Sequence, residues 1–277
     1  MSLKIAGVIP CKGTSQRLKS KNLKKLHGIP LFLWAANNLN RVIPKRLIYI
    51  DSESDEILNI AKQKGFSTIK RPENLASNKT DGNALMFWEA KNIDADIVVQ
   101  HLPPMPFLRK KTLIKAIKMV KNEFDSVFAV YKQHQYSWEG KKPNYSIDKI
   151  PNSKDLKEIE IEGMGLYVAK KSFLIKEKKR ICGNFSKIEI NNFEAIDIDY
   201  ESDFVFAETL AQGLSNDSEY LQGLYKFKLN EPRIIIFDID GVMTNGGMYY
   251  LGNNNYAKKF NAKDGLAIKD MIKKNID

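Results

Sequence analysis

Residues 4–22, which read KIAGVIPCKGTSQRLKSKN, decide the fold. Their apolar beginning, Lys4 to Ile9, predicts a buried strand, and a polar, basic loop from Pro10 to Asn22 follows it directly. Ligands of open α/β sheets bind beyond the carboxyl ends of the strands. Gly13, two hydroxyl groups and several cations in this loop offer backbone N–H groups and positive charge to a triphosphate, although a solvated basic loop has the same composition.

The rest of the chain alternates short apolar runs with amphipathic segments, which is typical of βαβ units around a mainly parallel sheet. Further strands are expected at residues 46–51, 96–100, 126–130, 163–168 and 195–199. Helices are expected from Pro30 onward and at residues 54–64, 81–91, 111–122 and 202–212. The sequence therefore predicts one α/β domain over residues 1–213.

Two segments depart from this alternation of predicted strands and helices. Residues 131–161 place aromatic side chains and lysines among turn residues, in a connection longer than most in compact domains. We expect a dimer arm or a substrate lobe there. Residues 214–232 resemble a linker, after which an apolar strand opens a separate segment over residues 233–277.

Composition and charge narrow the class of protein. Hydrophobic residues form 43% of the 277 residues, and no apolar run approaches the ~20 residues that span a bilayer. The net charge is +11, but 37 lysines and only 7 arginines are spread over the whole chain, whereas nucleic-acid surfaces favour clustered arginine. The two cysteines have no paired spacing, and the N-terminus lacks a signal segment. We therefore expect a cytoplasmic protein with no nucleic-acid partner and no membrane partner.

Asp197 and Asp199 lie two residues apart in the expected strand at residues 195–199, so both carboxylates point to one face. Two hard oxygen ligands suit Mg²⁺, which keeps several waters and takes further ligands from substrate phosphates. An acidic turn at a strand end has the same sequence, so both interpretations stay open. Asp203, near the start of the next helix, is expected to cap that helix.

The basic loop resembles the N-terminal signature of the CMP-acylneuraminate synthetases, also called CMP-sialic acid synthetases. The matching residues are Pro10, Gly13, Ser15, Arg17, Lys21 and Asn22. Lys12 stands where the family has arginine, and Gln16 where it has lysine. Similar segments follow in the same order at residues 71–77, 103–109, 163–167 and 197–203. Four residues in or directly after these segments depart from the family pattern, namely Asn78, Pro104, Met105 and Met164.

The resemblance implies a Rossmann-like, three-layer nucleotidyltransferase fold with a mainly parallel mixed sheet. It implies an enzyme in which the anomeric hydroxyl of a nonulosonic, sialic-acid-type sugar attacks the α-phosphorus of CTP and expels pyrophosphate, with Mg²⁺ as cofactor. A homodimer or higher homo-oligomer is implied as well.

The resemblance also implies roles for particular residues. The implied catalytic residues are Lys21, Arg17 and Asp199, and the implied metal ligands are Asp197 and Asp199. The implied nucleotide-binding residues are Lys12, Gly13, Ser15, Arg17, Lys21, Asn22 and Arg71. The implied sugar-binding residues are Tyr167, Pro104 and Met105, although Tyr167 fits a buried core position equally well.

The segment from residue 233 carries a second motif. An apolar strand delivers Asp238 and Asp240 into a turn that contains glycine, which resembles the opening motif of haloacid-dehalogenase-like (HAD-like) phosphatases of the 3-deoxy-octulosonate 8-phosphate branch. In that family Asp238 would be the nucleophile and Asp240 the general acid and base. Residues 233–277 end before the later motifs of that fold, so we expect a truncated HAD-like segment without phosphatase activity.

Two other functions fit the same residues. A related cytidylyltransferase would act on 3-deoxy-octulosonate, legionaminate or pseudaminate. A catalytically inactive nucleotide-binding or assembly module is a different class, and the departures at Gln16, Asn78, Pro104 and Met105 favour it.

Overall fold

The computed structural model describes residues 3–213, 244, 249–252, 255–258 and 269. The chain divides into two compact units, residues 1–224 and 225–277. Within the second unit, two short antiparallel strands are described, β12 (Tyr249–Gly252) and β13 (Asn255–Ala257). The predicted linker and the predicted strand that delivers Asp238 and Asp240 lie outside the described residues.

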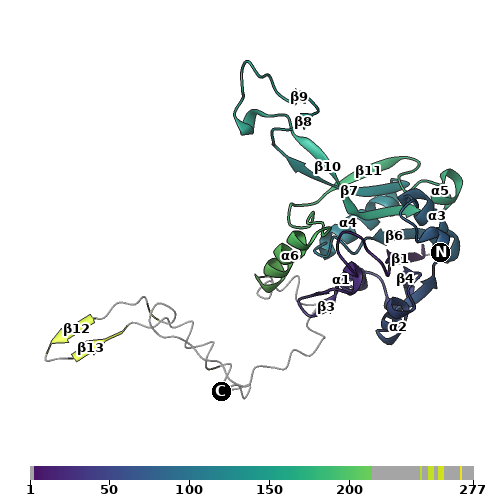
Figure 1. The fold of residues 1–277 in the computed structure, drawn as a ribbon, viewed down its shortest axis with the longest axis horizontal. Helices are drawn as coiled ribbons and strands as arrows, with labels where there is room; N and C mark the ends of the chain where they lie inside the picture. Colours follow the sequence, from purple (N-terminus) through teal and green to yellow (C-terminus); the bar gives the residue numbers. More distant parts are fainter. Residues whose placement is uncertain (1–2, 214–243, 245–248, 253–254, 259–268, 270–277) are drawn as a thin grey trace. The chain divides into compact units, whose positions relative to one another are not determined.

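The first unit is built on a seven-stranded sheet (Figure 1). In spatial order its strands are β11 (Phe185–Glu189), β7 (Ser126–Gln133), β10 (Ile159–Lys170), β6 (Ile97–His101), β1 (Ile5–Pro10), β4 (Ile48–Ser52) and β5 (Ser67–Lys70). β10 pairs antiparallel with both of its neighbours, and the other pairs of the sheet are parallel. The prediction of a mainly parallel mixed sheet is confirmed.

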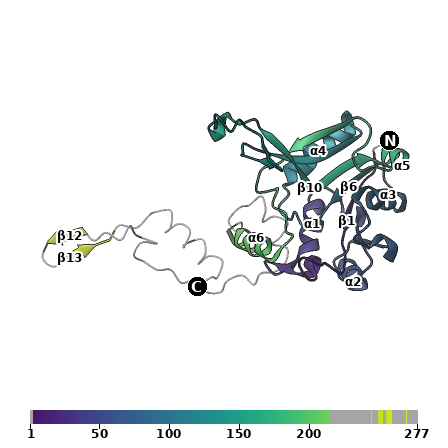
Figure 2. The ribbon, with the colours of Figure 1, turned by 45° about the horizontal axis from the view of Figure 1, so that its top comes forward.

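Helices cover both faces of this sheet, which makes the three-layer architecture that the sequence predicted (Figures 1 and 2). One face packs against α1 (Leu31–Asn40), α2 (Asp55–Gln63) and α4 (Lys110–Asn122). The other face packs against α3 (Gly82–Asn92) and α5 (Lys171–Glu177). A third cluster joins α1 to α6 (Glu201–Gly213). In the part of the chain that the structure describes, no helix is both long and apolar enough to cross a membrane.

Local sequence signals explain where these helices begin. The side chain of Ser54 accepts from the backbone N–H of Ile57 and starts α2, and Asp81 accepts from two backbone N–H groups and starts α3. On α2 the apolar residues Ile57 and Ala61 are four positions apart and fully buried against the sheet. Pro30 precedes the first residue of α1, a position where its missing N–H costs nothing.

Short elements connect the larger ones. They are β2 (Lys25–Leu26), β3 (Ile29–Pro30), β8 (Trp138–Glu139), β9 (Lys142–Pro143) and the 3₁₀ turns Lys21–Leu23, Lys45–Leu47, Glu73–Leu75 and Ser153–Asp155. β8 and β9 lie in an extension beyond β7 and β10 (Figure 1). This extension exposes Trp138, Ile147 and Ile150, and its assignment as a dimer arm or substrate lobe stays a prediction.

Among the elements that form or flank the main sheet, β5, α5 and β11 were not predicted from the sequence, and one predicted strand is wrong. The expected strand at residues 195–199 does not form, because residues 192–195 make a turn instead. Ile198 donates its backbone N–H to the Pro104 carbonyl at 2.9 Å, but the segment pairs with no strand of the sheet.

Candidate active site

A cavity of about 450 Å³ opens beyond the carboxyl ends of β1, β4 and β6. The loop after β1 supplies most of its wall, and the segments after β5 and β6 complete it. This is the edge at which open α/β sheets bind ligands, and the volume suits a nucleotide-sized molecule. The lining residues are Pro10, Lys12, Thr14, Ser15, Gln16, Arg17, Lys21, Asn22, Arg71, Asn78, Leu85, Leu102, Pro103 and Pro104.

The cationic loop and the acidic segment meet at this cavity. Lys21 Nζ lies 2.9 Å from Asp199 Oδ1, and Arg17 Nη1 lies 2.7 Å from Asp199 Oδ2. Lys21 also donates to the backbone carbonyl of Ile198 at 2.9 Å. Both Lys21 and Arg17 line the cavity, so the Asp199 carboxylate and the Ile198 carbonyl join the acidic segment to its wall.

Asp197 is the second acidic residue of that segment. Burial raises the pKa of its carboxyl group, and the neighbouring charge of Asp199 raises it further. Two carboxylates that repel each other at a half-buried place favour a cation between them. Mg²⁺ needs only one or two protein carboxylates when phosphates supply further oxygens, so the donor set fits it. Within the described residues, no cluster of three or more metal-binding side chains is present.

Two contacts hold the acidic segment in place. The Asp203 carboxylate accepts the backbone N–H groups of Asp199 at 3.0 Å and Tyr200 at 2.8 Å, so Asp203 caps the start of α6 as expected. Pro104 accepts the N–H of Ile198, so the turn after β6 positions the acidic pair through its backbone. Pro104 also lines the cavity.

Lys12 joins the loop after β1 to the segment after β5. Its ammonium group donates to the Ser77 carbonyl at 2.9 Å and to Asn78 Oδ1 at 3.1 Å. Burial lowers the pKa of Lys12, and the nearby charge of Arg71 lowers it further. Both acceptors are neutral, so these contacts do not cancel the positive charge of Lys12 at the cavity wall. Two residues that depart from the synthetase pattern, Lys12 and Asn78, thus contact each other.

Gly13 has a different role from the one predicted for it. Its backbone N–H donates to Glu53 Oε1 at 2.7 Å, and Gly13 is absent from the cavity wall. A Cβ at this position would lie 2.7 Å from Cβ of Ser54, so the close approach requires glycine. The expectation that this N–H meets a phosphate is replaced by a role in anchoring the loop to the start of α2. Asn22 also anchors the loop, because its side chain donates to the Lys12 carbonyl at 2.8 Å.

Arg71 lies at the cavity wall but is almost wholly buried. Its Nε and Nη2 atoms donate to Asp51 Oδ2 at 2.9 and 2.6 Å, and Nη2 also donates to the Asp51 carbonyl at 3.0 Å. Its side chain is 1% exposed, and that of Asp51 is 0% exposed. The sequence predicted Arg71 for this site, but the sequence analysis did not predict the buried carboxylate of Asp51 that holds it.

Two of the predicted sugar-binding residues lie elsewhere. Met105 is buried in the core, where Gly165 leaves room for its side chain. Tyr167 is buried on the opposite face of the sheet, with its hydroxyl donating to Glu162 and the Arg180 guanidinium 3.9 Å from its ring centroid. Neither residue lines the cavity, which corrects the sugar-site prediction for both. Asp238 and Asp240 lie outside the described residues.

The sequence reasoning missed three acidic residues near the cavity, namely Asp51, Glu53 and Glu89. Asp51 ends β4, Glu53 precedes α2, and Glu89 lies within α3. Asp51 had a visible signal, since it is a carboxylate at the end of an expected strand on the ligand-binding edge. A glutamate in the middle of a helix gives no such signal, because most glutamates on helices are on solvated faces.

The fold and the cavity define an α/β protein with a cationic, nucleotide-sized site beside an acidic pair. The chain belongs to the cytidylyltransferase family, whose family model, described as "Cytidylyltransferase", matches residues 6–228. The family confirms the cytidylyltransferase class implied by the resemblance of the loop after β1.

Two sequence relatives agree with this assignment, and a solved structure shares the fold. N-acylneuraminate cytidylyltransferase A of Danio rerio is 24% identical over 98% of this chain, and the match covers 63% of that protein's length. CMP-N,N'-diacetyllegionaminic acid synthase of Legionella pneumophila is 28% identical over 76% of this chain and 97% of its own. A solved structure of CMP:2-keto-3-deoxy-manno-octonic acid synthetase complexed with CTP has a similar fold, with a TM-score of 0.60, 12% identity and coverage of 76% of this chain and 99% of its own.

Proposed function

We propose that this protein is a cytidylyltransferase that transfers CMP from CTP to the anomeric hydroxyl of a nonulosonic, sialic-acid-type sugar and releases pyrophosphate. The observation that carries the proposal is the contact of Lys21 and Arg17 with Asp199 at the cavity wall. Two segments about 180 residues apart in sequence thereby bring cations that suit a phosphate and carboxylate oxygens that suit a metal ion to one place.

The residues at the cavity would supply positive charge, hydrogen-bond donors and carboxylate oxygens to the substrate. Lys21, Arg17 and Lys12 provide positive charge for a triphosphate, and Ser15 and Thr14 add hydroxyl donors. Asp197 and Asp199 would hold Mg²⁺, which would offset the charge that develops on the phosphate oxygens. In the structure, Arg17 and Lys21 neutralise the charge of Asp199. If Mg²⁺ binds that carboxylate instead, the two cations become available to bind phosphate.

The nucleotide base would lie deeper in the cavity, toward Asn22 and Arg71. Arg71 carries a fixed guanidinium group whose hydrogen bonds to Asp51 leave it oriented at the wall. A pyrimidine presents carbonyl and ring-nitrogen acceptors, which match an arginine donor. The sugar would occupy the side near Pro104 and the acidic pair.

The proposed sugar class follows from the relatives that match most of the chain. The N-acylneuraminate relative aligns over nearly all of it, and the legionaminic acid relative aligns over three quarters. Both names refer to nine-carbon acidic sugars. An octulosonate acceptor is the alternative, because the octonic acid synthetase has a similar fold.

The experiment is a pyrophosphate-release assay with CTP, Mg²⁺ and a panel of N-acetylneuraminate, legionaminate, pseudaminate and 3-deoxy-octulosonate. We expect release with at least one nine-carbon acid and weaker or no release with the octulosonate. Release that is fastest with 3-deoxy-octulosonate would move the assignment to the alternative acceptor. CTP binding without release for any sugar would favour the inactive nucleotide-binding module.

Three further expectations belong with this proposal. The protein is expected to act in the cytoplasm and to form a homodimer through residues 131–161, and a monomeric mass in solution would contradict the dimer. The HAD-like assignment of residues 233–277, with Asp238 and Asp240, remains a prediction.

A further inference from the structure

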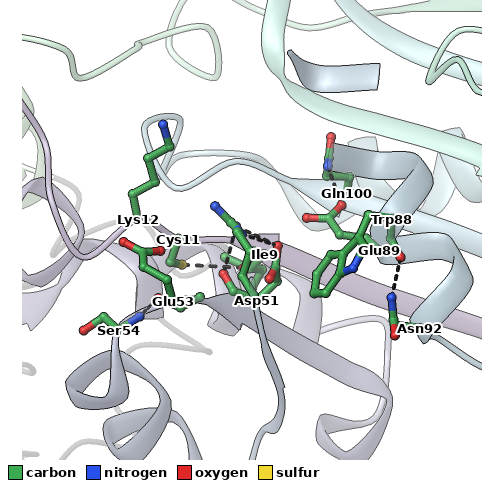
Figure 3. A network of polar contacts seen from close by, with 12 residues as sticks. Ile9, Cys11, Lys12, Asp51, Glu53, Ser54, Trp88, Glu89, Asn92 and Gln100 are labelled. Carbon is green, nitrogen blue, oxygen red and sulfur yellow. Dashed lines mark hydrogen bonds and ion pairs between the residues drawn. The ribbon is translucent and has the colours of Figure 1, made fainter. Parts of the chain in front are cut away.

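A buried polar cluster lies directly behind the cavity wall. Figure 3 shows Asp51 at its centre, with Glu89 and Gln100 on one side and Cys11 and Glu53 on the other. Glu89 and Asp51 are both 0% exposed, and Gln100 is 1% exposed. These three side chains come from α3, β4 and β6, so the cluster ties a helix to two strands beside the site.

Hydrogen-bond accounting in this cluster leaves four buried acceptor oxygens without a donor, and two of them belong to the carboxyl groups of Asp51 and Glu89; the other two are Glu53 Oε2 and Gln100 Oε1. Arg71 satisfies Asp51 Oδ2, and Gln100 Nε2 donates to Glu89 Oε2 at 2.6 Å. Asp51 Oδ1 and Glu89 Oε1 remain as buried acceptors without a donor. The two carboxyl groups are within hydrogen-bonding reach of each other. A single proton between them satisfies both oxygens, because a protonated carboxyl group is a donor.

Charge balance selects Glu89 as the proton carrier. Asp51 faces the Arg71 guanidinium directly, so its negative charge is compensated. Glu89 has no cation among its hydrogen-bond partners, and its ionisation would leave an uncompensated buried charge in the cluster. Burial raises the pKa of Glu89 well above its ordinary value near 4.5, and the negative charge of Asp51 raises it further.

The cluster reaches the cavity through Arg71. Its Nε and Nη2 atoms are bound to Asp51, whereas Nη1 has no hydrogen-bond partner in the part of the chain that is described. Arg71 lines the cavity, so Nη1 is the nitrogen left to bind a ligand there. Any shift of Asp51 would move this nitrogen, because three hydrogen bonds fix the guanidinium plane to that one residue.

We propose that Glu89 is a positioning residue for the nucleotide site: in its neutral form it donates a hydrogen bond to Asp51 and thereby holds the Asp51–Arg71 pair in the orientation that presents Arg71 to the nucleotide. The inference rests on the proposed function for the identity of the ligand, CTP. It concerns binding of the nucleotide and assigns Glu89 no contact with it.

The groups that face Glu89 come from every element packed around it. Asp51 on β4 is the carboxylate partner, Arg71 after β5 is the cation, and Gln100 on β6 is a neutral donor. Cys11, after β1, is a buried thiol whose pKa burial raises, so it adds no charge at neutral pH. Glu53 influences Asp51 and Cys11 and is anchored by the Gly13 N–H.

Two substitutions at one position test the proposal in the intact chain. Glu89→Gln reproduces the protonated carboxyl group, since its amide can donate to Asp51 and accept from Gln100. Glu89→Leu removes the donor and leaves Asp51 Oδ1 unsatisfied. We expect Glu89→Leu to raise both the Kd and the KM for CTP about tenfold or more, because the charged hydrogen bond from Arg71 to the nucleotide loses its orientation. The value of kcat should change by less than about threefold. Glu89→Gln should stay within about twofold of the wild type.

A double-mutant cycle separates positioning from a general loss of structure. Arg71→Lys removes the guanidinium fork, so Glu89→Leu should have little further effect on the Kd for CTP in that background. Additive losses would assign Glu89 a merely structural role. Unchanged CTP binding in Glu89→Leu, or an equal loss in Glu89→Gln, would overturn the proposal.

A stability measurement gives a readout that needs no activity, even if Glu89→Leu does not fold. A carboxyl group whose pKa is raised on folding contributes stability fully below its unfolded pKa and loses it as pH rises. The melting temperature of the wild type should therefore fall relative to Glu89→Gln between pH 5 and pH 8, by at least about 2 °C. Parallel curves for the two proteins would show that Glu89 is ionised in the folded state and would overturn the proposal. Failure of the pyrophosphate assay alone would leave these binding and stability results to decide it.

Discussion

At the scale of single residues, Lys21 carries the contact between the cationic loop and the acidic segment. Its ammonium group lies 2.9 Å from both Asp199 Oδ1 and the Ile198 carbonyl, and its side chain is 12% exposed. Lys21→Ala should lower kcat/KM for CTP by roughly 10²-fold, because an oriented cation at a triphosphate is lost. Steady-state pyrophosphate release measures this.

Lys19 provides the matched control for that substitution. It is in the same loop, is exposed and is absent from the cavity wall. Lys19→Ala removes the same charge, so it should keep kcat/KM within about twofold of the wild type. Equal losses in both variants would mean that only the net charge of the loop matters.

The acidic pair yields a second residue-scale prediction. Asp199→Asn should raise the half-saturating concentration of Mg²⁺ in the assay by about tenfold or more, because it removes the charge of a carboxylate that we propose to bind the metal. Asp203→Asn is the control, since Asp203 caps α6 and an asparagine retains the acceptor. A normal Mg²⁺ dependence of Asp199→Asn would exclude that carboxylate as a ligand.

For these residues a family motif predicts which side chains lie together. It brought Lys21, Arg17 and Asp199 to one site without any geometry, and the structure places the three side chains in contact. Their roles toward a ligand stay predictions. The motif failed for Gly13 and Met105, whose contacts depend on how closely Ser54 and Gly165 approach in three dimensions. Nothing local in the sequence encodes these approaches.

At the scale of elements, β6 ends in a buried histidine, which predicts that the stability of the fold depends on pH. His101 Nδ1 donates to the Gly165 carbonyl on β10, and Nε2 accepts from Asn38 on α1 at 3.3 Å. Both contacts use the neutral ring. Burial lowers the pKa of His101 from 6.5 to about 4. Protonation would turn the acceptor Nε2 into a donor that faces another donor.

Protonation of His101 is therefore expected to destabilise the folded protein. A histidine whose pKa is lowered on folding contributes stability above pH 6.5 and loses it as the pH falls toward 4. The free energy of unfolding of the wild type should fall by up to about 3 kcal/mol more than that of His101→Asn between pH 7 and pH 4. Urea denaturation at each pH measures the difference.

His134 is the control for this titration. Half of its side chain is exposed, and it lies in the extension beyond β7. His134→Asn should retain the acid sensitivity of the wild type. If His101→Asn keeps that sensitivity as well, the buried ring does not cause it.

Elements with a clear periodic pattern of apolar residues were predictable from the sequence, and short edge elements were not. α4 and β1 follow from their apolar patterns, and α2 follows from its serine cap as well. β5 and β11 have only four and five residues, and their place at the edges of the sheet comes from neighbours distant in sequence. Residues 195–199 alternate like a strand but find no partner, so the pattern alone was misleading.

At the scale of the first unit, one arrangement explains the sequence, the fold and the proposed chemistry. The sheet sets β1, β4 and β6 side by side, and the loop after β1 spans their carboxyl ends. Cations from residues 12–21 and carboxylates from residues 197–199 meet there because the turn at Pro104 holds the acidic segment against the cavity. The family pattern implied both groups, but only the fold brings them into contact.

A crystal structure of the protein with CTP and Mn²⁺, with the metal located by its anomalous scattering, tests this arrangement directly. We expect a metal peak at the Asp197 and Asp199 carboxylates and the triphosphate against Lys21 and Arg17. A nucleotide bound outside this cavity, or a metal that contacts neither aspartate, would contradict the central claim.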